Sequence, residues 1–372
     1  MATMLRRTLA CVSYLVGSMV APDGPPSAVE LVGRHLKEQS PVWADGDTAT
    51  FFYQGEAEGV ELGFDGEIHS LKRLLGTDVW TLAITRPELD RAVFCYRLTP
   101  KDRDRPPAKS LGDPPVWRGP KAPRAAVEAA RLKGRLNTVD VPSRRFPKGR
   151  RATVYLPPGH DPRGRTKVVY AADGEVIDWF ARVLEPLIET GRIPPVAVVG
   201  VHSGGYVGGV PDLKDYEQEK DLRLQEYFPG INPKRFAEHE AFFCEELPGW
   251  AEKEFAVSPS RDDRAVFGVS NGGRFAVEMG LRHPDLFGHI FGFSVAGDEQ
   301  FPNLPLGNDG QPRYYLASGL WKESFYRCTS SLARGLEGRG VPVKFSSRIA
   351  GHDAAMWRDE FANALQRAFD KK

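Results

Sequence analysis

The stretch that decides the fold reads Arg264-Ala-Val-Phe-Gly268-Val-Ser270-Asn-Gly-Gly273, and a helical pattern over 274–282 follows it. A strand, the motif G-x-S-x-G and a helix in this order form the sharp turn that presents a nucleophilic serine. The glycines are needed because the turn is too tight for side chains on either side of the serine. The turn lifts the hydroxyl to the carboxyl edge of a sheet, where a helix N-terminus favours developing negative charge. We therefore expect Ser270 to be a nucleophile, although the motif without its flanking strand and helix would be a common accident.

The chain around this turn predicts an α/β domain over residues 141–372. Apolar strands alternate there with helical stretches, and continuous Val, Ile and Phe runs indicate strands that are buried on both faces. Helices between such strands cover a mostly parallel, doubly wound sheet. The strands are expected at 152–156, 167–172, 196–201, 264–268, 289–295, 313–317 and 343–349.

Three other regions precede this domain. Residues 41–100 carry short β-type runs separated by turn residues, which predicts a small Ig-like β-sandwich with strands at 48–53, 59–63, 79–84 and 92–97. Residues 101–140 are rich in proline and basic side chains, so we expect a linker, with an anion-binding strip as the alternative.

Residues 1–40 form an N-terminal extension. Arg6-Arg7 precede a mostly apolar run over 8–21, which has the shape of a secretory signal and is too short to span a bilayer. A buried helix would look similar, so cytoplasmic and exported locations both stay open.

Composition excludes several classes of protein. The 372 residues are 41% hydrophobic and 27% charged with a net charge of +1, so we expect neither disorder nor nucleic-acid binding. No later stretch has the length and apolarity of a membrane span. The four cysteines lie far apart without zinc-ligand spacing, so no metal is expected. The oligomeric state is open.

A serine nucleophile needs a base and an acid that orients the base. In the α/β-hydrolase arrangement these follow the serine in the order acid, then histidine, on loops after later strands. His352 follows the last predicted strand and is the predicted base. Glu323 follows the strand before it and is the predicted acid. Asp298 comes one strand too early, and Asp353 is expected to cap the next helix.

The oxyanion formed by attack on a carbonyl needs two backbone N–H donors. One should belong to Asn271, directly after the nucleophile. The other should come from Asp173-Gly174-Glu175, which follows an early strand. Glu175 is the predicted donor, and Gly174 would let the backbone approach the substrate. An ordinary Asp-Gly turn is the alternative.

The segment from about residue 151 onward resembles the esterase branch of the α/β hydrolases that contains enterochelin esterase, esterase D and feruloyl esterases. The matching pieces are 170–175, 223–227, 245–248, 268–273, 283–288 and the ending Gly351-His-Asp-Ala-Ala-Met-Trp357. Residues 49–55 and 75–80 are similar to the N-terminal domain of enterochelin-esterase-like proteins. The resemblance implies a serine carboxylesterase with Ser270 as nucleophile and His352 as base. Two departures are Asn271, where many relatives have Met, and Glu323, one place later than the usual acid.

We therefore expect an ester hydrolase that forms an acyl-enzyme with a Ser-His-Glu triad and needs no cofactor. The resemblance implies siderophore-type esters, which are anionic, or feruloyl and acetyl esters of carbohydrates. Arg223 and Arg274 are predicted cationic substrate contacts, together with Lys322, Arg348 and Arg358 nearby. Trp357 and Gly174 are also predicted to contact the substrate. A non-hydrolytic binding protein or an acyltransferase on the same fold is the alternative from another class.

Overall fold

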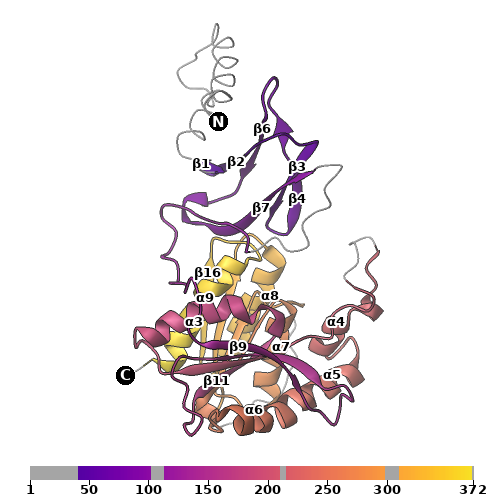
Figure 1. Ribbon diagram of the computed structural model, residues 1–372, viewed down its shortest axis with the longest axis vertical. Helices are drawn as coiled ribbons and strands as arrows, with labels where there is room; N and C mark the ends of the chain where they lie inside the picture. Colours follow the sequence, from indigo (N-terminus) through magenta and orange to yellow (C-terminus); the bar gives the residue numbers. More distant parts are fainter. Residues whose placement is uncertain (1–40, 102–112, 210–214, 298–309, 371–372) are drawn as a thin grey trace. The chain divides into compact units, whose positions relative to one another are not determined.

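The computed structural model describes residues 41–101, 113–209, 215–297 and 310–370 (Figure 1). It divides the chain into two compact units, Met1–Pro123 and Arg124–Lys372. This division splits the region that we predicted as a linker. Strand β8 (Val116–Arg118) pairs with β7 (Val93–Lys101) in the first unit, whereas β9 (Arg135–Val141) belongs to the sheet of the second. None of the helices in the described ranges is long and apolar enough to cross a membrane.

The first unit is a sandwich of two four-stranded sheets, in the orders β1-β2-β6-β5 and β4-β3-β7-β8. Its remaining strands are β1 (Val42–Asp45), β2 (Thr48–Gln54), β3 (Gly59–Phe64), β4 (Glu67–Ser70), β5 (Lys72–Arg73) and β6 (Val79–Thr85). Phe51 of β2 packs against Phe64 and Phe94 of the other sheet, with ring centroids 5.8 Å and 6.1 Å away. Alternate residues of β3 are buried, as expected for strands with one face toward a core.

The second unit contains an eight-stranded sheet in the order β16-β15-β14-β13-β11-β12-β10-β9. Its other strands are β10 (Arg150–Leu156), β11 (Lys167–Ala172), β12 (Val196–Val201), β13 (Arg264–Val269), β14 (His289–Phe293), β15 (Arg313–Gly319) and β16 (Val343–Arg348). Strands β9 and β10 are antiparallel to their neighbours and the other pairs are parallel. Every residue of β12 and β13 is buried. The predicted α/β fold preceded by a β domain is confirmed.

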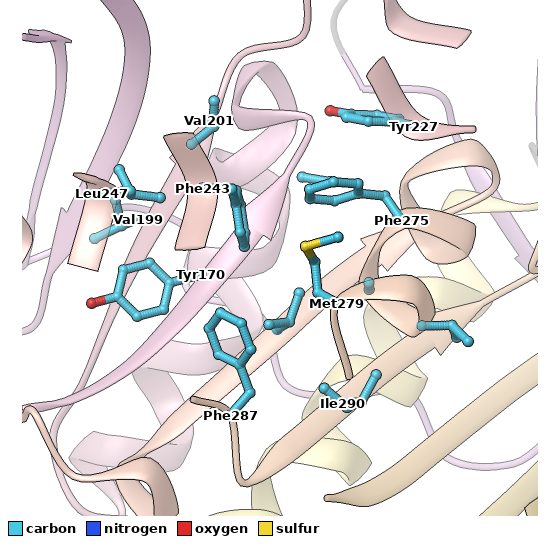
Figure 2. Packing of buried hydrophobic residues seen from close by; sticks show 14 of the residues in the cluster. Tyr170, Val199, Val201, Tyr227, Phe243, Leu247, Phe275, Met279, Phe287 and Ile290 are labelled. Carbon is cyan, nitrogen blue, oxygen red and sulfur yellow. The ribbon is translucent and has the colours of Figure 1, made fainter. Parts of the chain in front are cut away.

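Helices cover both faces of this sheet. The larger ones are α3 (Ile177–Glu189), α5 (Pro233–Ala241), α6 (Leu247–Phe255), α7 (Asn271–Arg282), α8 (Glu323–Glu337) and α9 (Ala354–Phe369), with α4 (Leu222–Tyr227) between β12 and α5. Phe180 of α3 and Phe361 of α9 pack on Phe267 of β13, each with ring centroids 4.6 Å apart. Figure 2 shows the other face, where Phe275 and Met279 of α7 lie among Tyr170, Phe243 and Ile290. Because both faces are packed, the strand ends are held in fixed register, and their carboxyl edge can carry a site.

Candidate active site

Ser270 lies in a strained turn between β13 and α7. Its backbone angles are φ 57° and ψ −124°, which a non-glycine residue adopts only at a cost on the order of 1–3 kcal/mol. Two backbone hydrogen bonds hold Ser270 in this conformation. Ser270 N–H donates to the carbonyl of Phe293 at 2.9 Å, and Ala296 N–H donates to the carbonyl of Ser270 at 3.2 Å. A Cβ atom on Gly268 would overlap the carbonyl of Gly272, so this position accepts only glycine. The predicted sharp turn is therefore present.

The turn opens into a cavity of about 390 Å³ that contains both the predicted nucleophile and the predicted base. Most of its wall is aliphatic or aromatic, with three aromatic rings and two valines. Its lining residues are Asp173, Glu175, Val176, Trp179, Phe180, Ser203, Arg223, Val269, Ser270, His352 and Trp357. A pocket of this size with a few polar groups around a nucleophile is typical of small-ligand sites.

His352 is flanked by two aromatic rings. Its ring centroid lies 4.3 Å from that of Phe325 and 4.6 Å from that of Trp357, which meets it edge-on. Trp357 is itself fixed, because its Nε1–H donates to Ser294 Oγ at 2.9 Å. Trp357, a predicted substrate contact, thus lines the cavity and also packs on the predicted base.

The pKa of His352 is lowered to about 4, mainly by burial and in part by the charges of Arg223 and Lys322, while a backbone hydrogen bond partly opposes the shift. The imidazole is therefore neutral at pH 7. A neutral imidazole can accept a proton from a serine hydroxyl, which is what a general base must do.

Glu323 lies away from this cavity. It is the first residue of α8, its side chain is 80% exposed, and its carboxylate pairs with Arg327 at 3.6 Å. The described residues show no contact between Glu323 and His352. Asp298, the alternative acid, lies outside the described residues. Asp353 caps α9, as predicted, by accepting a hydrogen bond from Ala355 N–H at 2.8 Å.

The two predicted oxyanion donors lie near the turn. Asn271 is the first residue of α7, so its N–H has no acceptor within the helix. Glu175 lies in the short helix η2 (Gly174–Val176) and lines the cavity. Gly174 has a packing role, because a Cβ atom there would overlap the carbonyl of Gly200 on β12. It is not among the cavity-lining residues, in contrast to its predicted contact with substrate.

Asp173 and Arg223 form an ion pair in the cavity wall that sequence reasoning missed. Arg223 Nε and Nη2 donate to the two carboxylate oxygens of Asp173 at 2.6 Å and 2.7 Å. Asp173 adopts left-handed backbone angles, and its Oδ2 would lie 2.6 Å from a Cβ atom on Gly272. Tyr227 accepts a hydrogen bond from Asp173 N–H at 3.1 Å. Asp173 therefore lies where the loop after β11 approaches the turn at Ser270; the signal was an Asp-Gly pair directly after a buried strand.

Arg274, another predicted substrate contact, makes its contacts with Glu278 of α7 and with Phe228. It donates to Glu278, whose side chain is fully buried, at 2.9–3.0 Å, and its guanidinium lies over the ring of Phe228. It is not among the residues that line the cavity. In the structure, Arg274 therefore forms an internal ion pair with Glu278, which lies one helical turn further along α7.

A second buried network holds the loop after β12. Glu226 accepts two hydrogen bonds from Arg150, at 2.8 Å and 3.0 Å, and one from Gly204 N–H at 2.8 Å. Arg150 also donates to the carbonyl of His202 at 3.0 Å. Ser203, which lines the cavity, lies between these two anchored residues, so the network fixes one wall of the site.

A serine on a strained strand-to-helix turn, with a histidine after the last strand in the same cavity, defines the α/β-hydrolase class. The family described as "Putative esterase" matches residues 143–368, which is more than half of the chain. The chain belongs to this esterase family, and it is an ester hydrolase.

Solved structures resemble the chain at low sequence identity. An enterobactin esterase from Shigella flexneri is 19% identical with a TM-score of 0.65, over 88% of this chain and 94% of its own. A ferulic acid esterase from Anaeromyces mucronatus is 18% identical with a TM-score of 0.51, over 65% of this chain and 93% of its own. The first similarity spans both units and the second about two thirds of the chain. No protein in the set of curated sequences matches this one.

Proposed function

We propose that the protein hydrolyses esters whose acyl group carries an aromatic ring, through Ser270 and His352. The observation that carries this proposal is one cavity in which Ser270, a neutral histidine and aromatic walls occur together. His352 would take the serine proton, Ser270 would attack the ester carbonyl, and the alcohol would leave with that proton. Water activated by His352 would then release the acid from the acyl-enzyme.

The N–H groups of Asn271 and Glu175 are proposed to hold the oxyanion of the tetrahedral intermediate. Both belong to elements that meet at the turn of the nucleophile, and the helix N-terminus at Asn271 adds a favourable dipole. Burial raises the pKa of the Glu175 carboxyl, and the Ser203 N–H, which donates to it at 3.1 Å, opposes this shift. The backbone N–H of this residue, and not its side chain, has the proposed catalytic role.

The proposed acyl group carries an aromatic ring because Trp179, Phe180 and Trp357 line the cavity. Two classes of ester meet this requirement. A structure of the Shigella enterobactin esterase was obtained with 2,3-dihydroxy-N-benzoyl-serine, and one of the Anaeromyces enzyme with ferulic acid. Siderophore-type esters are the first candidate, supported by a similarity that extends over both units. Feruloyl esters of carbohydrates are the second candidate, supported by the aromatic cavity alone.

A panel of esters tests the acyl preference. We expect kcat/KM for methyl ferulate or for a 2,3-dihydroxybenzoyl-serine ester to exceed that for an acetyl ester at least tenfold. Methyl cyclohexanecarboxylate is the matched control for ring volume without aromaticity. Equal kcat/KM across the panel would contradict an aromatic acyl site while leaving an esterase in place.

Glu323 stays the predicted acid, and a substitution tests it. To orient His352, its carboxylate would have to leave Arg327 and solvent. The Glu323→Gln variant should lose about 10²-fold or more in kcat if Glu323 is the acid. A loss below threefold, equal to that of the exposed control variant Glu337→Gln, would remove Glu323 from the catalytic set.

A further inference from the structure

Three of the arginines predicted near the site pair with carboxylates of the protein itself, and Lys322 is not among the described residues that line the cavity. Arg274 pairs with Glu278, Arg348 with Glu360 and Arg358 with Glu128. None of these three arginines lines the cavity, whose one guanidinium belongs to Arg223 among the described lining residues. The recognition of an anionic substrate would therefore depend on Arg223.

Arg223 is already occupied by Asp173. The carboxylate takes both Nε and Nη2 in a two-pronged hydrogen-bonded pair, and the guanidinium lies 5.2 Å from the ring centroid of Tyr227. Burial would lower the pKa of Arg223, but the hydrogen bond and charge of Asp173 more than offset burial and raise it. The Arg223 guanidinium is thus held in its charged form, and a substrate carboxylate would have to compete with a bidentate internal partner.

The charges of the described residues that line the cavity do not sum to a positive value. Among these residues, the paired Arg223 and Asp173 cancel, His352 is neutral at pH 7, and Glu175 is the other titratable group. The sum is zero when Glu175 is protonated and −1 when it is ionised. An anionic acyl group would lose hydration in an apolar cavity without gaining a free cation.

We propose that the Asp173–Arg223 pair makes this cavity select uncharged acyl groups, and hence feruloyl-type over anionic siderophore-type esters, with Asp173 as the specificity-determining residue. The inference rests on the proposed function, because it concerns the acyl group of the ester that Ser270 attacks. It also predicts that removing the Asp173 charge and removing the Arg223 charge shift the selectivity between neutral and anionic acyl groups in opposite directions. Without the Asp173 charge, Arg223 is free to pair with an anionic acyl group; without the Arg223 charge, Asp173 repels it.

The test compares two esters of nearly the same shape that differ in charge, p-nitrophenyl 4-carbamoylbenzoate and the p-nitrophenyl ester with a carboxylate at the same position. The wild-type protein should prefer the neutral ester by at least tenfold in kcat/KM. Asp173→Asn should shift this ratio at least fivefold toward the carboxylate, and Arg223→Gln should shift it the other way. Asp140→Asn, which removes an exposed carboxylate on the edge strand β9, should leave it unchanged. The ratio cancels any general loss of turnover from a disturbed oxyanion loop.

Binding to the Ser270→Ala variant gives the same comparison without turnover. By calorimetry, methyl benzoate should bind more tightly than the monomethyl terephthalate anion, and the Asp173→Asn substitution in this background should reduce the difference at least fivefold. An unchanged ratio, or a preference of the unsubstituted protein for the anion, would overturn the inference. If the wild type hydrolysed neither ester while the binding ratio behaved as stated, the proposed function would fail and the charge selection would stand.

Discussion

The neutral state of His352 makes a prediction about the dependence of activity on acid pH. With a pKa of about 4, the imidazole is about 97% neutral at pH 5.5, whereas an ordinary histidine with a pKa of 6.5 would be about 9% neutral. The acid limb of kcat/KM reports the pKa of the base in the free enzyme. We therefore expect activity to stay nearly constant from pH 7.5 down to about pH 5.

The Phe325→Ala substitution tests whether burial causes the low pKa of His352. Burial is the largest cause of the lowered pKa, and Phe325 covers one face of the imidazole at a centroid distance of 4.3 Å. Its removal lets water reach the ring, which stabilises the protonated form and should raise the pKa by about one unit or more toward 6.5. At a pKa of 5, activity at pH 5 would fall to about half of its plateau, whereas the wild type would keep about 90%.

The assay is kcat/KM for a p-nitrophenyl ester from pH 5 to 8, followed at the isosbestic wavelength of the nitrophenol product. Tyr326→Ala is the matched control, because Tyr326 is the next residue of α8 and packs on Phe345 and not on His352. The control should keep the wild-type profile. Two results would show that burial does not set the pKa of His352. One is a wild-type kcat/KM that falls with a midpoint near pH 6.5, and the other is a Phe325→Ala variant whose kcat/KM depends on pH in the same way as that of the control.

Three further changes should have measurable effects. Ser294→Ala leaves the buried Trp357 Nε1–H without its acceptor at 2.9 Å and should cost about 1–3 kcal/mol in the free energy of unfolding, measured with urea. Gly272→Ala places a Cβ atom 2.6 Å from Asp173 Oδ2 and should reduce kcat more than tenfold, whereas unchanged kcat would contradict the tight turn. Burial lowers the pKa of His239 to about 4, so the unfolded state binds the extra proton and stability falls as pH drops below about 6.5. Between pH 7 and pH 5, the free energy of unfolding should fall by about 2 kcal/mol less in the His239→Phe variant than in the wild type. An equal dependence of this free energy on pH in the two proteins would contradict the prediction.

The central strands and the turn of the nucleophile could be predicted from sequence because their chemistry is local. Strands β12 and β13 are buried on both faces and therefore appear as unbroken apolar runs. Strand β9 was missed because it is an edge strand with mostly exposed, polar side chains, which look like the linker before it. The glycines around Ser270 marked a turn whose strain the backbone angles bear out.

The parts of the site that sequence could not predict depend on pairing between distant residues. Asp173 and Arg223 are 50 positions apart, and the sequence shows each only as a turn residue and a cation. Glu323 follows the expected strand, but a helix begins at this residue and its carboxylate lies in solvent. Position along the chain thus located the right edge of the sheet without fixing which side chains turn into the cavity.

The central claim is that Ser270 is the nucleophile of an esterase. The most direct measurement is hydrolysis of p-nitrophenyl benzoate by the purified protein beside its Ser270→Ala variant, with Ser203→Ala as a control for another cavity-lining hydroxyl. We expect turnover by the wild type and the control, and a loss of several orders of magnitude in kcat for Ser270→Ala. Equal turnover by Ser270→Ala and the wild type would contradict it.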